Sequence, residues 1–430
     1  MLRVGTASAD ITPPVGVELC GYGFYLRRAA TGVLDRLMTR ALYAESDSGR
    51  ALFIGNDLIG VDAELTRRTR ALCRKHLGVP EEALMLVGTH THSGPATIPI
   101  YGCGESDPQY YEHLPYVWLD VARRAMAETR PARLRLARGP IDPVGYDRHD
   151  DSGPVDRELR IACFEVGERP VALLVNHSAH GVMFGRENTR ISADWPGVLQ
   201  RCLETALPGA AAIFVQGSCG TINCRPACLN FEEGARQIEA TGQRVAEAAL
   251  EILRAATRLG EDAMVSATSS IVPLPLEVQS VGSLTSLRDE HQCRIADPAL
   301  DASARNAARM YAGSYQHLLD AYADGDVAMT WPAEIQILRL GSLRIVGVPG
   351  ELFMALGQRV LDAGSEDALV MIAGYANEFL GYLPTREAYG DPRYVYPTQV
   401  VPAMRGIFPF QAGACEMLIE NAIGLLQTTG

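Results

Sequence analysis

The sequence contains a single lysine, Lys75, among its 39 basic residues. Schiff-base enzymes and the usual phosphate-binding loops both depend on a lysine, because they need a compact ammonium group with an adjustable pKa. Lys75 lies at the end of an arginine-rich stretch, 65–75, which is typical of the solvated face of a helix. The sequence therefore gives no support to either class of lysine-dependent site.

Positive charge and long apolar runs are also scarce. The net charge is −12 at pH 7, so the averaged surface repels phosphate backbones and anionic membranes. No apolar run reaches the roughly 18 residues of a spanning helix, and the N-terminal residues lack the apolar run of a secretory signal. We therefore expect a soluble, cytoplasmic protein that acts on a small molecule and binds neither nucleic acid nor membranes. Its ten cysteines are expected to be reduced thiols.

Short apolar segments alternate with longer amphipathic ones, which predicts an α/β protein. We expect a single domain over residues 1–430, with a helical insertion at about 280–328, and a homo-oligomer is compatible with this sequence. Strands are expected at 51–55, 83–88, 134–138, 158–166, 171–176, 211–216, 263–274, 334–340 and 342–348, and helices at 65–77, 110–129, 197–206, 231–255, 302–323 and 352–363.

Four of the nine histidines fall in two short windows. The first window is Gly88-Thr-His-Thr-His-Ser-Gly-Pro95 and the second is Asn176-His-Ser-Ala-His-Gly181, and each follows an apolar strand. In an extended chain, residues two apart face the same way, so His90 and His92 can point at one site from the strand end. Neutral imidazole is a good zinc ligand, and a catalytic zinc keeps one position open for water. The alternative is that these histidines are satisfied core or loop residues.

Several further motifs, in this order along the chain, resemble the catalytic domain of neutral (alkaline, non-lysosomal) ceramidases and their bacterial relatives. The resemblance implies mixed β-sheets with packed helices, and the chain looks like that domain without the C-terminal immunoglobulin-like module. The motifs are Gly5-Thr-Ala-Ser-Ala-Asp-Ile-Thr-Pro-Pro-Val-Gly16, Gly21-Tyr-Gly23, the Thr-His-Thr-His block, Ile191-Ser-Ala-Asp-Trp-Pro-Gly197, Val348-Pro-Gly-Glu351 and Ala376-Asn-Glu-Phe-Leu-Gly-Tyr382.

The resemblance also implies roles for individual residues. One zinc ion per chain is expected, with His90, His180, Glu351 and Tyr382 as its ligands. His92 is expected beside the substrate, and Arg148 and Tyr394 are expected in the substrate pocket. From the sequence alone Glu351 has a second interpretation, because a helix is expected to start at Leu352. A carboxylate there is either a metal ligand or a charge that complements the helix dipole.

One block departs from the family pattern. Ceramidases carry Gly-Asp-x-Ser-Pro-Asn, with a serine implicated in catalysis, where this chain has Gly220-Thr-Ile-Asn-Cys-Arg225. Asn223 takes the place of that serine, and a carboxamide is a poor nucleophile, although it can donate a hydrogen bond to a developing oxyanion. Ser218 and Cys224 are weaker alternatives as nucleophiles. Cys219, Cys224 and Cys228 do not follow a recognised metal spacing and are expected to be free thiols.

The mechanism compatible with this change is hydrolysis by metal-activated water, which needs no protein nucleophile. We therefore expect a zinc-dependent amidohydrolase that acts on a soluble N-acyl compound, with His92 moving protons. Two alternatives stay open. The same metal site would also serve a lactone or ester hydrolase, and the changed loop at Asn223 would also suit a degenerate member that binds a ligand without turnover.

Overall fold

The computed structural model describes residues 1–256 and 263–428. Its first large sheet contains β1 (Arg3–Asp10), β3 (Met38–Ser46), β4 (Gly49–Asn56), β5 (Leu84–Gly88) and β6 (Arg130–Pro131). The second contains β7 (Arg133–Pro140), β9 (Glu158–Val166), β10 (Arg169–His177) and β12 (Ala211–Gln216), and the third contains β14 (Val265–Pro275), β15 (Thr330–Leu340), β16 (Leu343–Gly347) and β18 (Leu369–Ala373).

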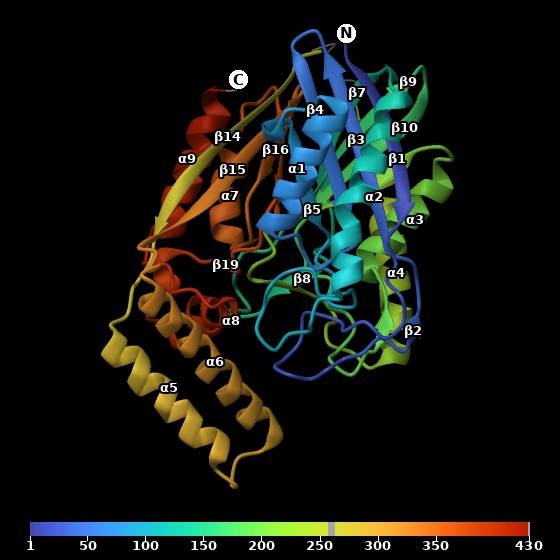
Figure 1. Cartoon of the computed structure of the whole chain (residues 1–430). Coiled ribbons are helices and arrows are strands. Elements are labelled where there is room, and N and C mark those ends of the chain that lie inside the picture. Colours follow the sequence, from blue (N-terminus) through green and yellow to red (C-terminus); the bar gives the residue numbers. More distant parts are fainter. Residues whose placement is uncertain (257–262, 429–430) are drawn as a thin grey trace.

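The strand orders are β5-β4-β3-β1-β6, β12-β10-β9-β7 and β14-β15-β16-β18 (Figure 1). Each sheet has one parallel pair, namely β4 with β5, β10 with β12, and β16 with β18, and its other pairs are antiparallel. The expected α/β fold with mixed sheets is confirmed.

Helices pack on the outer face of each sheet, as Figure 1 shows. The pairs are α1 (Ala63–Leu77) with α2 (Pro108–Ala127), α3 (Asp194–Ala206) with α4 (Phe231–Ala255), and α7 (Met354–Asp362) with α9 (Ala414–Thr428). Buried apolar side chains from all three sheets share one cluster on the inner side, including Phe53, Phe164 and Ile345. Burying each such side chain contributes about 1.5–3 kcal/mol to stability, which holds the three sheets together.

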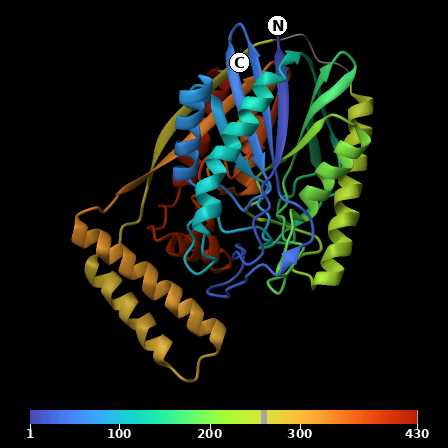
Figure 2. The same ribbon diagram turned by 45° about the vertical axis from the view of Figure 1, so that its right-hand side comes forward.

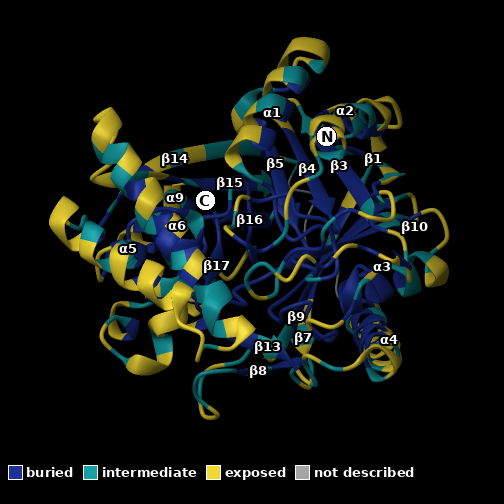
Figure 3. Cartoon of the chain, turned by 60° about the horizontal axis from the view of Figure 1, so that its bottom comes forward, coloured by how far each residue is buried: buried dark blue, intermediate teal, exposed yellow. Residues whose placement is uncertain are grey.

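Two helices, α5 (Val281–Ala296) and α6 (Ala302–Asp324), leave the body between β14 and β15. Those two strands pair with each other from Val265↔Leu340 to Pro275↔Thr330, so the helices extend a hairpin connection. Figure 2 shows this pair projecting from the body, and Figure 3 shows the many exposed positions along α5. The division into one domain with an insertion stays a prediction. Among the described helices, none combines the length and apolar character needed to cross a membrane.

Some elements were not expected from the sequence, including β1, β3, β18 and α9. β1 is rich in small residues, which have weak strand preference, and it is stabilised by eight paired positions with β3. Short strand pairs lie beyond the ends of the large sheets, where the chain enters its connecting loops. They are β2 (Gly32–Val33) with β11 (Arg190–Ile191), β8 (Gly145–Asp147) with β13 (Ile222–Cys224), and β17 (Glu351–Leu352) with β19 (Tyr382–Leu383). The second and third pairs position most of the candidate site residues.

Candidate metal centre and active site

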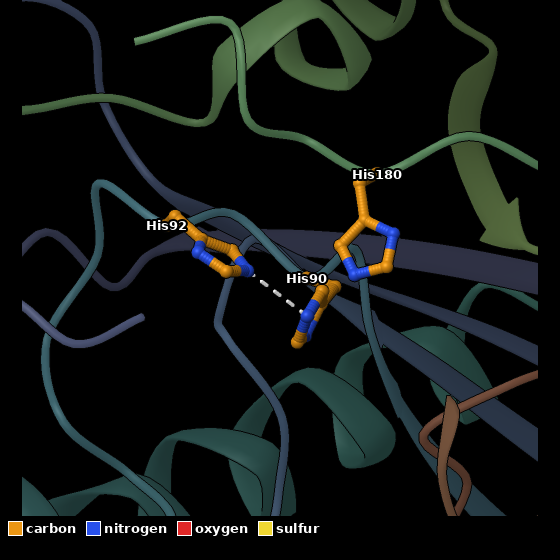
Figure 4. Close-up of side chains that lie close together, drawn as sticks. All are labelled: His90, His92 and His180. Carbon is orange, nitrogen blue, oxygen red and sulfur yellow. Dashed lines mark hydrogen bonds between the residues drawn. The ribbon is translucent and has the colours of Figure 1, made fainter. Parts of the chain in front are cut away.

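His90 and His92 lie in the loop that follows the fully buried strand β5. The main chain at His90 has φ +64°, in the left-handed region, so this loop is not the extended segment that the sequence predicted. The two rings nevertheless meet edge to face, with their Nε2 atoms 3.0 Å apart. Figure 4 shows both rings gathered with that of His180. The His90 and His92 rings converge as expected, but they do so through the turn at His90 and not through an extended segment.

His180 lies just beyond the end of β10. Its loop is joined to the His90 loop by a bridge between Thr91 and Gly181, and the amide of His92 donates to the carbonyl of Gly181 at 3.2 Å. The amide of His180 donates to the carbonyl of Ile222 in β13 at 3.0 Å. Two strand ends that are distant in sequence are therefore fixed side by side.

Glu351 lies in β17, not at the start of a helix. The helix expected from Leu352 begins at Met354, and Phe353 occupies the cap position. Oε2 of Glu351 is 2.9 Å from Nε2 of His180, and Oε1 is 3.9 Å from Nε2 of His90. The helix-dipole interpretation of Glu351 is therefore wrong, because its carboxylate faces the imidazoles.

Tyr382 is paired directly with Glu351 in the parallel β17–β19 ladder, and its side chain is buried. Arg148 lies over the Tyr382 ring at 4.9 Å, and its Nη2 donates to the carbonyl of Gly220 at 3.0 Å. The buried Nε of Arg148 has no hydrogen-bond partner among the described residues. Burial lowers the pKa of Arg148, but Tyr382 and Glu351 outweigh it and raise the pKa above its usual value. Arg148 therefore presents a retained positive charge with one unused donor.

Tyr394 and Asn223 lie farther from the imidazole cluster. The Tyr394 ring contacts His149 at 4.6 Å and Phe353 at 5.7 Å, and Phe353 in turn contacts Tyr382 at 6.5 Å. Asn223 is partly exposed in β13, next to Ile222, whose carbonyl holds His180. The backbone of β13 thus connects Asn223 to His180. Ring contacts through Phe353 connect Tyr394 to Tyr382.

The three histidines differ in what their Nδ1 atoms bind. Nδ1 of His90 bonds to the carbonyl of Ile59 at 2.7 Å, and Nδ1 of His180 bonds to the carbonyl of Ile222 at 2.9 Å. Such bonds fix the tautomer and direct Nε2 toward the ligand position, as in known metal centres. Nδ1 of His92 is buried without a partner in the described chain. Backbone carbonyls therefore orient the rings of His90 and His180, whereas no such bond orients the ring of His92.

Burial and charge set the protonation of these groups. Burial lowers the pKa of His90 to about 4 and that of His92 well below its usual value. Burial also lowers the pKa of His180, but Cys219 and Glu351 outweigh it and raise the pKa to about 10. Burial raises the pKa of Glu351, while His90 and His180 outweigh it and lower the pKa. His90 and His92 are therefore neutral at pH 7, whereas His180 shares a proton with Glu351, and binding of a divalent cation would release that proton.

The donor atoms of His90, His92 and His180 lie within 4.8 Å of one another, so the three could hold a metal ion. Two nitrogens on one tetrahedral zinc at 2.0–2.1 Å are about 3.3 Å apart, and the Nε2 atoms of His90 and His92 are 3.0 Å apart. The residues present therefore fit a metal.

Two residues near the imidazoles were not predicted. Tyr375 stacks on His90, with centroids 4.0 Å apart, and its hydroxyl is 3.0 Å from Sγ of Cys219. Nothing in the sequence distinguished Tyr375 from an ordinary packed aromatic. Cys219 was expected only to be a free thiol. All ten cysteines are indeed free thiols, and seven are buried.

The family model for neutral/alkaline non-lysosomal ceramidase, N-terminal, matches residues 2–223, just over half of the chain. The chain belongs to this family. The match includes His90, His92, Arg148 and His180 and ends at Asn223. Membership of the ceramidase family places the chain among hydrolases.

Individual ceramidases agree with this assignment. The neutral ceramidase of Mycobacterium tuberculosis is 25% identical over 92% of this chain and 73% of its own length. The neutral ceramidase of Pseudomonas aeruginosa is 24% identical over 91% of this chain and 68% of its own. The crystal structure of neutral ceramidase from Pseudomonas aeruginosa matches with a TM-score of 0.73 at 19% identity, over 99% of this chain and 75% of that one. At this identity the structural likeness shows a shared fold.

Proposed function

We propose that the chain is a zinc-dependent amidohydrolase that cleaves the N-acyl bond of a soluble small molecule without a protein nucleophile. The observation that supports this most directly is the convergence of three imidazoles and the Glu351 carboxylate, with two of the rings oriented by backbone carbonyls. The relatives are named neutral ceramidases, and ceramide is itself an N-acyl compound. An amide is therefore the favoured scissile group.

His90, His180, Glu351 and Tyr382 would hold the ion. When bound, zinc acts as a Lewis acid that lowers the pKa of water from 15.7 to about 7, which provides hydroxide at neutral pH. His92 is neutral because burial lowers its pKa, so its Nε2 can accept a proton from the attacking water and deliver it to the leaving amine. The unused Nε donor of Arg148 is suited to a negatively charged oxygen on the substrate.

A soluble substrate is proposed because the net charge of −12 disfavours approach to anionic lipid surfaces. The test uses one acyl chain in three forms: a water-soluble amide, the matched ester, and ceramide in neutral detergent. We expect the soluble amide to be hydrolysed fastest, with activity lost on chelation and restored by Zn²⁺. Hydrolysis that survives chelation would overturn the proposal. Cleavage of the ester alone would indicate an esterase, and bound zinc with no turnover would indicate a ligand-binding protein.

Hydrolysis without a protein nucleophile can be tested at Asn223, which takes the place of the family's serine. We expect Asn223→Ala to lower kcat by about 10²–10³-fold, the effect of losing one oxyanion donor, with unchanged zinc content. No covalent acyl-enzyme should accumulate in the parent, as checked by intact-protein mass spectrometry during turnover. An acylated parent would contradict hydrolysis without a protein nucleophile. An Asn223→Ala variant with full activity would contradict the role of Asn223 as an oxyanion donor. Arg225→Ala, two residues along the same segment, is the matched control.

A further inference from the structure

The face of the His90 ring is covered by Tyr375. The two rings stack with centroids 4.0 Å apart and an interplanar angle of 16°. The Phe379 ring is nearly parallel to both, 6.1 Å from Tyr375 and 6.3 Å from His90. Tyr375 is fully buried, so neither solvent nor a mobile side chain competes for this contact. The stacking contact with Tyr375 therefore constrains the orientation of the His90 ring.

The hydroxyl of Tyr375 is anchored by Cys219. The oxygen and Sγ are 3.0 Å apart, and both residues are fully buried. A buried tyrosine hydroxyl normally needs a partner, and here the thiol provides it. Cys219 is also one of the groups that raise the pKa of His180.

The backbone around Tyr375 is held in an unfavourable conformation. Tyr375 has φ +57° and Asn377 has φ +63°, both in the left-handed region that non-glycine residues seldom adopt. Such conformations persist only where surrounding bonds enforce them. The amide of Asn377 donates to the carbonyl of Leu86 in β5 at 2.8 Å, and its Oδ1 accepts from the amide of Leu86 at 3.0 Å. The amide of Tyr375 donates to the carbonyl of Gly350 at 3.3 Å. This segment therefore ties the strand before His90 to the residue before Glu351.

A single hydrogen bond at Nδ1 fixes the tautomer of His90 but lets the ring tilt about that bond. The stacked ring restricts the tilt. We propose that Tyr375, anchored by Cys219, is a positioning residue that sets the orientation of His90 for metal binding. This inference rests on the proposed function, because it takes His90 as a metal ligand.

The test compares Tyr375→Leu with Phe164→Leu, which removes an equally buried ring from β9 in a different core cluster. Zinc affinity is measured by competition with a chromogenic chelator, and the geometry of the site by the visible spectrum of the Co²⁺-loaded protein. We expect Tyr375→Leu to bind zinc about 10–100-fold more weakly and to alter the cobalt spectrum, as is typical when a group that orients a ligand is lost. Phe164→Leu should match the parent in both measurements. Parent-like affinity and spectrum in a folded Tyr375→Leu would overturn the proposal.

Milder variants keep the test decisive if Tyr375→Leu does not fold. Tyr375→Phe retains the stacked ring and removes only the hydroxyl, and Cys219→Ala removes its partner. Because the two groups act as one pair, we expect each variant and the double variant to weaken zinc binding by the same factor, smaller than that of Tyr375→Leu. Parent-like zinc binding by Tyr375→Phe would overturn the role of the anchor. If the parent itself bound no zinc, the proposed function would fail and this inference with it, whereas unchanged variants of a zinc-binding parent would remove this inference alone.

Discussion

Replacing His90 with alanine is expected to remove bound zinc and to lower kcat/KM at least about 10³-fold. Nε2 of His90 lies 3.0 Å from that of His92 and 3.9 Å from the Glu351 carboxylate, so alanine opens a gap in the donor set. The Lewis acidity of a bound metal provides several kcal/mol of transition-state stabilisation, and each 1.36 kcal/mol is a factor of ten in rate. Metal content by atomic emission and rates on the soluble amide measure both effects.

His76→Ala is the matched control for this experiment. His76 is exposed in the last turn of α1, so its removal should change neither zinc content nor rate. A His90→Ala protein that retains one zinc per chain would show that the ion binds elsewhere. Loss of zinc with full activity would show that catalysis does not require the metal. Either result would contradict the proposed function.

Replacing His92 with alanine is expected to lower kcat by about 10²–10⁴-fold while zinc binding stays close to that of the parent. This range is typical of losing a general acid or base. The two effects separate because Nδ1 of His92 lacks the carbonyl bond that orients His90 and His180, although its Nε2 is equally close to the site. Chelator competition measures zinc affinity, and the pH profile of kcat should lose the limb that reports protonation of His92.

A different outcome would reassign His92. If His92→Ala lost zinc to the same extent as His90→Ala, then all three imidazoles would be ligands, and another group would move the proton. His113→Ala provides a second control, because His113 is an exposed residue of α2. Its rate and zinc affinity should equal those of the parent.

Much of the fold could be predicted from the sequence, since strands such as β5, β10 and β12 contain continuous apolar runs. Their ends were predicted to within a few residues, as for β12, expected at 211–216 and found at Ala211–Gln216. β1 was missed because small residues give little pattern, and its position depends on pairing with β3. Local sequence is informative where the apolar pattern is strong. Local sequence does not predict a strand that forms only through pairing with a neighbouring strand.

The candidate site shows the same division. The histidine windows were evident from the sequence, His180 was selected by the family resemblance, and the structure brings His90, His92 and His180 together. Glu351 was assigned two readings, because the sequence after Pro349 and Gly350 resembles a helix start. The structure forms β17 there instead, because Glu351 pairs with Tyr382, which is thirty-one positions later in the chain. Such a parallel pairing cannot be predicted from the residues on either side of Glu351.

The sequence by itself determined which side chains with suitable chemistry follow which buried strands, because apolar periodicity and residue type are local properties. Tertiary structure decided how those side chains are oriented. The left-handed turn at His90, the carbonyls that bind two Nδ1 atoms, and the Tyr375 ring over His90 all come from segments far apart in the chain. Orientation depends on contacts between distant segments, and these form only when the three sheets pack around their shared core.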